Sequence, residues 1–312
     1  MKKRIGALIV AVVLIFSAFI GLTACDKGDG VSQNLLFGLN NDEKGYTLVG
    51  LGRCNDTEII VPETYRNLPV TQVARRAFLP NNSNAKENLI TKIVLPKTIE
   101  RVGNNAFTYC TSLKEVVFSS SVTELGESVF SSCTNLESVT LPSNLTVIKD
   151  STFHGCKKLK DIVIPTTVTK IEYRAFRECE SLDSVNFPSG LKTIGHEAFF
   201  GCSSLTSVNL PTSLTELGGY SFAYTKVKTF TVPKNVKTVN SGLLGWCEEL
   251  ETLNLPADLI SIEMSALAYC INLTTINFAG TLQQWNDLSI AENVFDETPK
   301  MIIYCVDGEI YN

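Results

Sequence analysis

The chain has 312 residues, of which 44% are hydrophobic and 19% are charged, a composition typical of a folded protein rather than a disordered one. The formal net charge is −5, and no extended basic run occurs along the chain. Nucleic acid is therefore not an expected partner, because binding to it depends on clustered Lys and Arg side chains.

The N-terminal segment of the chain, up to Cys25, differs from the rest. Lys2, Lys3 and Arg4 precede an apolar run that extends over residues 5–21 without a charge. This pattern predicts a signal peptide at residues 1–24. The following stretch, Leu22-Thr23-Ala24-Cys25, resembles a bacterial lipobox, which implies lipid attachment at Cys25 and contact with a membrane through that lipid. An uncleaved membrane anchor is the alternative, and residues 25–33 read as a polar tether in either case.

Residues 34–55 have the pattern of a β-hairpin. Leu35, Phe37 and Leu39 alternate with other residues, and the polar segment 40–45 is suited to a turn. Tyr46 and Leu48 then resume the alternation. We expect this hairpin to be an N-terminal cap, because the first coil of a repeat array needs a cover for its open end.

Residues 56–278 contain a sequence repeat. Phe107, the first clear marker, recurs at a constant step at Phe130, Phe153, Phe176 and Phe199. Cysteine follows the same step, with one shortened unit before the last two members. A fixed period of this length predicts a solenoid. The cysteines in register are Cys110, Cys133, Cys156, Cys179, Cys202, Cys247 and Cys270.

Each unit contains a short Val-x-Leu segment with a period of two, which predicts a β-strand. A proline usually follows and ends the strand, because proline cannot donate to a β-ladder. Leu-x-x-Ile-Gly predicts a second extended piece, and Ala-Phe-x-x-Cys predicts one turn of helix or 3₁₀-helix. We expect about nine to ten coils, each of roughly 22–23 residues, a period within the range of known repeat architectures. The coils should stack in parallel, with phenylalanine on phenylalanine. Residues 279–312 leave the period and read as a C-terminal cap, in which Trp285 covers the last coil.

These units closely resemble the BspA-type bacterial leucine-rich repeats. The proline after the strand, the Ile-Gly pair and Ala-Phe-x-x-Cys carry the resemblance, which covers nearly all of the chain after the leader. It implies a leucine-rich-repeat solenoid displayed on the cell surface and used in adhesion or partner binding. The chain departs from the pattern at Ser119, at Thr225, and by one missing residue just after Thr225. We therefore expect a local irregularity at the sixth coil.

Seven cysteines in register cannot all pair with one another, since seven is odd. Their side chains also point the same way on stacked coils, whereas a disulfide needs Cβ atoms that approach. Buried free thiols are the expectation, with disulfides or a metal as alternatives. His154 and His196 are the only histidines and are expected to be polar surface residues. No catalytic motif is present, so we expect neither an enzyme nor a cofactor.

Two surfaces are candidates for binding. Outward positions of the later strands carry hydroxyl and amide groups that could hydrogen-bond a glycan or an extended peptide, although these are also ordinary residues of a β-surface. A second column of aromatic residues precedes the cysteine position in three successive coils. Those rings could bind a sugar or a protein partner, or could simply pack at the edge of the core. The two sets are Ser184, Asn186, Ser207, Asn209, Thr229, Thr252 and Asn254, and then Tyr224, Trp246 and Tyr269.

These features predict an exported, lipid-anchored scaffold at the cell surface that binds an extracellular protein or glycan. The alternative is a structural envelope protein that associates with copies of itself and has no small ligand. For the binding module we expect a monomer, whereas the structural alternative would assemble as its concentration rises.

Overall fold

The computed structural model describes residues 30–81 and 85–311. These lie in the compact unit Val31–Asn312, apart from Gly30, which belongs to a separate unit at the N-terminus. The expected signal peptide at residues 1–24, Cys25 and most of the tether lie outside the described residues. In the part of the chain that is described, no helix is both long enough and apolar enough to cross a membrane.

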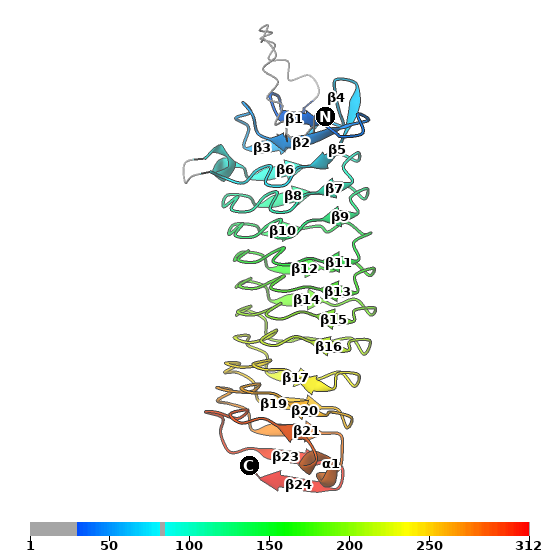
Figure 1. The fold of residues 1–312 in the computed structure, drawn as a ribbon. Coiled ribbons are helices and arrows are strands. Elements are labelled where there is room, and N and C mark those ends of the chain that lie inside the picture. Colours follow the sequence, from blue (N-terminus) through cyan, green and yellow to red (C-terminus); the bar gives the residue numbers. More distant parts are fainter. Residues whose placement is uncertain (1–29, 82–84, 312) are drawn as a thin grey trace, which may run out of the picture. The chain divides into compact units, whose positions relative to one another are not determined.

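The unit is a parallel β-solenoid in which nearly every coil contributes one strand to each of two columns (Figure 1). Neighbouring coils pair in register, as where Ile93 faces Val116. The first column contains β3 (Glu58–Ile60), β6 (Lys92–Val94), β8 (Glu115–Val117), β10 (Ser138–Val139), β12 (Asp161–Val163), β14 (Ser184–Asn186), β17 (Thr229–Thr231), β19 (Thr252–Leu255) and β21 (Thr275–Phe278). The second contains β5 (Leu68–Val73), β7 (Arg101–Val102), β9 (Glu124–Leu125), β11 (Val147–Ile148), β13 (Lys170–Ile171), β15 (Thr193–Ile194), β16 (Glu216–Leu217), β18 (Thr238–Val239), β20 (Ser261–Ile262) and β22 (Ser289–Ile290).

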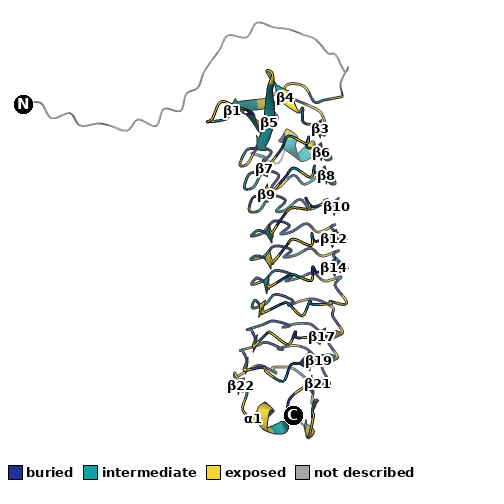
Figure 2. Ribbon diagram, turned by 90° about the vertical axis from the view of Figure 1, so that its right-hand side faces the viewer, coloured by how far each residue is buried: buried dark blue, intermediate teal, exposed yellow. Residues whose placement is uncertain are grey.

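A column of phenylalanine rings forms the centre of the core. Centroids of successive rings are 5.1–5.5 Å apart, and all the rings are fully buried. Leu244 and Leu267 continue the column and are equally buried. Figure 2 shows that buried positions recur from coil to coil. The expected stacking is thus present, and the ring column consists of Phe78, Phe107, Phe130, Phe153, Phe176, Phe199 and Phe222.

The Ala-Phe-x-x-Cys segments are consecutive turns rather than the helical turn expected from the sequence. In each of these coils two residues have a positive φ, as at Asn105 (59°) and Tyr109 (62°). A left-handed residue stops the run of right-handed residues that a helix requires. The amide of Cys110 therefore bonds back only to the carbonyl of Phe107, at 3.1 Å.

Both ends of the solenoid carry additional elements. Antiparallel strands β1 (Leu36–Leu39) and β2 (Tyr46–Gly50) begin the unit, and the short β4 (Thr64–Tyr65) pairs with β5. A 3₁₀-helix, η1 (Lys86–Leu89), lies in the insertion before β6. At the other end are α1 (Leu282–Asn286), β23 (Ile302–Cys305) and β24 (Gly308–Tyr311). Trp285 of α1 is buried against Phe278, with the two ring centroids 5.5 Å apart.

The first column lacks a strand at the coil where the sequence departs from the repeat, and its ladder also stops between β10 and β12. Residues 205–211 are not part of any strand, so Ser207 and Asn209 do not lie on the strand that the pattern predicted. Among the described residues, the backbone groups of residues 207–210 make no hydrogen bond to other backbone groups. The coil that begins at Leu205 is shorter than its neighbours by a single position, which shifts the start of the next strand. Pairing resumes where β17 meets β19.

Candidate binding surfaces

A groove of about 640 Å³ lies where the strands of the first column end, between the interruption and the C-terminal cap. Strands β17, β19 and β21 are in register there, so their last residues form one line across successive coils. Pro233 and Pro256, which follow β17 and β19, and Ala279 after β21 form the second side of the groove. Its lining includes Asn209, Thr231, Asn254, Asn277, Leu210 and Phe278.

Amide side chains on these strands form a hydrogen-bonded ladder. Asn254 Nδ2 donates to Thr231 Oγ1 at 2.9 Å, and Asn277 Nδ2 donates to Asn254 Oδ1 at 2.8 Å. In the described part of the chain, the side-chain oxygen of Asn277 and the whole amide of Asn209 have no protein partner. The ladder is therefore held in place by its own bonds, while Asn277 at one end and the separate Asn209 amide can still bond a ligand.

The groove combines this polar ladder with apolar side chains. Val208 and Leu210 are half-buried, and Phe278 is almost fully buried beneath the last coil. Lys234 is the only charged residue that lines the groove. A site of mixed polar and apolar character with so little charge is suited to an uncharged ligand with many hydroxyl or amide groups.

Two tyrosines in the C-terminal cap lie near this surface and were not among the residues predicted from the sequence. Tyr304 lies opposite Asn277 in the register of β21 and β23 and is 41% exposed. Tyr311 is 69% exposed, and its hydroxyl donates to Glu309 Oε1 at 2.5 Å. Neither ring stacks on another ring within the described residues, and both rings are partly exposed to solvent. The alternation of residues 302–305 could have indicated Tyr304, because it places that side chain on the outward face.

The strand-face residues predicted from the sequence fall into two groups, on either side of the missing strand. Asn209 and Asn254 line the groove, and Thr229 and Thr252 lie on the same outward face. Ser207 is exposed in the segment without a strand. The remaining two, Ser184 and Asn186, are exposed on β14, beyond the interruption and outside the groove.

The three aromatic residues chosen from the sequence form a continuous stack. The rings of Tyr224 and Trp246 have centroids 5.1 Å apart and planes 4° apart. The rings of Trp246 and Tyr269 are 5.3 Å and 8° apart. We call these three residues the aromatic strip. Phe200 lies against its first ring, with centroids 5.0 Å apart.

The aromatic strip occupies an unfavourable backbone conformation. Tyr224, Trp246 and Tyr269 have φ values of 59°, 60° and 61°, whereas two other coils place Gly155 and Gly201 at this position. A left-handed conformation costs a residue other than glycine about 1–2 kcal/mol. Each stacked pair returns about 0.5–1.5 kcal/mol. The ring contacts therefore offset part of this backbone cost, and the repeat imposes the same conformation on Ser132 and Glu178 in other coils.

The strip lies before the strands in each coil, whereas the groove lies where the strands end. No residue of the aromatic strip lines the groove. Both faces of Trp246 are covered by its neighbours, which leaves the ring edges exposed to solvent. The central ring of the strip is therefore suited to contacts through its edges.

The cysteines in register are free and fully buried. Each thiol donates to a backbone carbonyl of the preceding coil, as where Cys156 Sγ lies 3.1 Å from the carbonyl oxygen of Phe130. Burial raises the pKa of these thiols, to about 11 at Cys247, which keeps them protonated and unreactive. Thr225 takes the same position and donates to Phe222, at 2.8 Å.

The two histidines belong to one cluster of charged side chains. His154 Nε2 lies 3.8 Å from Glu178 Oε2, and His196 Nδ1 lies 3.5 Å from Glu197 Oε1. Arg177 contacts both Glu178 and Glu197 and so connects the two histidine–glutamate pairs. Burial lowers the pKa of His154. Among the described residues, no group of His, Cys, Asp and Glu is arranged to hold a metal ion.

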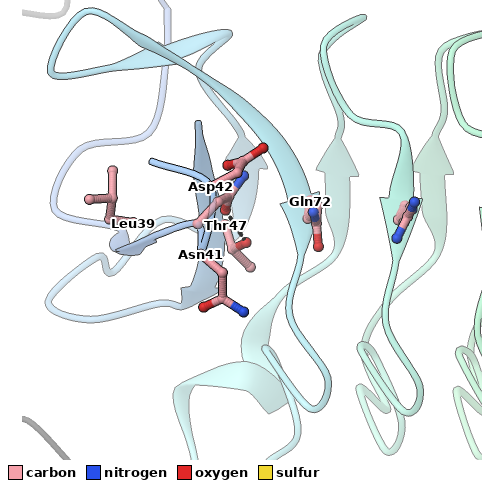
Figure 3. A pocket seen from close by; sticks show the side chains of 7 residues that line it. Leu39, Asn41, Asp42, Thr47 and Gln72 are labelled. Carbon is pink, nitrogen blue, oxygen red and sulfur yellow. Dashed lines mark hydrogen bonds between the residues drawn. The ribbon is translucent and has the colours of Figure 1, made fainter. Parts of the chain in front are cut away.

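A smaller hollow of about 410 Å³ lies beside the N-terminal hairpin (Figure 3). Asn41 and Asp42 come from the turn between β1 and β2, and Gln72 comes from β5. Thr47 Oγ1 donates to Asn40 Oδ1 at 2.6 Å, and Asn40 Nδ2 donates to Thr71 Oγ1 at 3.0 Å. These bonds attach the hairpin to the first coil, and the larger groove, with its mixed polar and apolar lining, is the stronger candidate.

The repeat and the solenoid define a class of protein, the leucine-rich-repeat solenoids. A family model described as "BspA type Leucine rich repeat region" matches residues 78–196 and 169–301 in six copies. The chain belongs to this family. No curated protein sequence matches it.

Several solved structures are similar to the chain. The leucine-rich-repeat protein TpLRR of T. pallidum is 26% identical, with 77% of this chain and 88% of that one covered and a TM-score of 0.41. A leucine-rich cell surface protein of Faecalibacterium prausnitzii A2-165 is 22% identical, with 83% and 97% covered and a TM-score of 0.35. The pneumococcal vaccine antigen PcpA is 15% identical, with 86% and 97% covered and a TM-score of 0.34.

Proposed function

We propose that this protein is a non-catalytic binding module displayed outside a bacterial cell, and that its groove holds a neutral glycan chain. One observation carries the proposal, namely the groove in which the amide ladder of Thr231, Asn254 and Asn277 faces apolar side chains with a single charge nearby. Membership of a bacterial leucine-rich-repeat family supports a binding or scaffold role.

The spacing of the ladder suits a polymer. Coils repeat at about 4.8 Å, the inter-strand distance, so amide groups recur along the groove at that step. Hydroxyl groups of an extended glycan can accept from and donate to these amides, because each amide offers both a donor and an acceptor. Next to Asn277, the exposed part of the Tyr304 ring can pack against the C–H face of a sugar ring.

The experiment is an array that carries neutral glycans, charged glycans and extracellular matrix proteins, probed with the purified chain. The purified chain should be retained on neutral glycans, and raising the salt concentration should not weaken this binding, because the groove has little charge. Retention only on charged glycans or only on matrix proteins would reject the ligand class. Size-exclusion chromatography at several concentrations tests the monomer in the same preparation, and concentration-dependent assembly would favour the structural alternative.

The location outside the cell rests on the proposed signal peptide and on lipid attachment at Cys25. Mass spectrometry of the protein from membranes should find a chain that begins at Cys25 and carries a diacylglyceryl group. The Cys25→Ala variant should lose that mass and leave the membrane fraction. An unmodified chain that begins at Met1 would contradict the anchor without affecting the groove.

A further inference from the structure

The aromatic strip has features that the groove does not explain. Within the described residues, the hydroxyls of Tyr224 and Tyr269 and the indole N–H of Trp246 have no hydrogen-bond partner. Both tyrosines are 43% exposed, so their polar ends face solvent. The strip therefore offers a row of apolar ring edges with unused polar groups at its outer margin. This combination is enriched at protein–protein interfaces.

Acidic residues border the strip on its C-terminal side. Glu248 and Glu249 follow Trp246 in the chain, and the backbone amide of Tyr269 donates to the carbonyl of Asp296 at 2.8 Å. Glu297 comes next and is exposed, as are Asp296 and Glu248.

Lys226 is the basic residue of this border. It is already engaged, because its Nζ lies 3.7 Å from Glu249 Oε1. The border is therefore negative overall.

We propose that the aromatic strip and its acidic border dock a basic segment of a partner protein. The aliphatic stems of Lys or Arg side chains lie along the ring edges, and their cations face Glu248, Asp296 and Glu297. Backbone carbonyls of the partner accept from the tyrosine hydroxyls and the indole N–H. The stacked faces of Trp246 leave its edges for contact, which suits side-chain stems better than a sugar ring.

The proposal is independent of the groove, so each can fail without the other. The test measures binding of the purified chain to an immobilised Arg- and Lys-rich peptide, with a Glu-rich peptide of equal length as the reference. The basic peptide should bind and the acidic one should not. Raising the salt should weaken binding, because the border is exposed and screened.

Trp246→Gly removes the central ring and suits the left-handed backbone, since Gly155 and Gly201 occupy the same position in other coils. It should weaken binding of the basic peptide by about tenfold, as expected for a central aromatic anchor. Tyr109→Gly is the matched control. Tyr109 has the same conformation (φ 62°) and is 56% exposed, but lies far along the solenoid from the strip, so its loss should leave binding unchanged.

A second variant, Glu248→Gln with Asp296→Asn, keeps the rings and removes two charges. It should weaken binding by about tenfold and flatten the salt dependence. Basic-peptide binding that survives Trp246→Gly, or that Tyr109→Gly weakens equally, would show general attraction to an acidic protein and overturn the proposal. Absence of binding to the basic peptide would also overturn it.

Discussion

Phe153 and Phe176 lie nearly face to face, with ring centroids 5.2 Å apart and planes 10° apart. Each ring also stacks on a ring of the coil beyond it, so both faces of each contact a neighbour. The core is therefore continuous from coil to coil, and a single coil cannot bury its own hydrophobic residues.

Phe153→Ala should lower the free energy of unfolding by about 3–5 kcal/mol, because it leaves a cavity between two stacked rings. Phe153→Leu should lower it by less than about 1.5 kcal/mol, since leucine fills the same position at Leu244 and Leu267. Urea denaturation followed by circular dichroism measures both. Equal losses for the two variants would contradict the stacked column.

The thiols in register should not react with iodoacetamide in the native protein. Their side chains are fully buried and burial raises the pKa of each thiol, so little thiolate is present at neutral pH. Cys305 is only partly buried and should be labelled first. Mass spectrometry of labelled peptides measures the order in which the cysteines react, with a denatured sample as the control. Rapid native labelling at Cys156 would show that the coils open.

Amide hydrogens of Val208 and Asn209 should exchange faster than those of Val185 and Phe230. The first two lie in the interruption, where the backbone makes no backbone–backbone hydrogen bonds, and the others lie in paired strands. Hydrogen exchange followed by mass spectrometry of overlapping peptides resolves the difference. Equal protection across residues 184–231 would mean that the column of strands is unbroken in solution.

Protonation of Glu197 at acidic pH should make the protein less stable. Burial alone would raise the pKa of this carboxyl, but Arg174 and Arg177 outweigh burial and hold the pKa below its ordinary value. Its contribution is thus present above the pKa of the unfolded chain, about 4, and is lost as the pH falls through the folded value. Glu197→Gln should therefore be less stable than the original protein at neutral pH. The difference in denaturation midpoint between the original protein and Glu197→Gln should become smaller below about pH 4. A difference that stays constant with pH would contradict the predicted role of Glu197.

The sequence predicted the solenoid because its information is periodic. Phe107 and Cys110 recur at a fixed step, so one unit specifies the position of every later ring and thiol. The outward direction of Asn254 followed from the alternation of a strand. Stacking of Trp246 between two tyrosines followed from register alone.

The groove could not be predicted in the same way. Its shape depends on how far Leu210 stands from β17 where pairing stops, and a missing residue indicates an irregularity without its geometry. Tyr304 was missed because the cap lies outside the repeat, so no register connected it with Asn277. The left-handed backbone at Trp246 was also not apparent, since aromatic residues rarely adopt it.

The most direct test of the account compares glycan-array retention of the original protein with that of two variants. Asn277→Ala with Tyr304→Ala removes one end of the amide ladder and the tyrosine ring, both on exposed side chains. Asn186→Ala is the control, because Asn186 holds the matching position on β14, outside the groove. The account predicts that the first variant loses neutral-glycan binding and that the control keeps it, with both folded. Retention of binding by the first variant, or equal loss in the control, would contradict a ligand site in the groove.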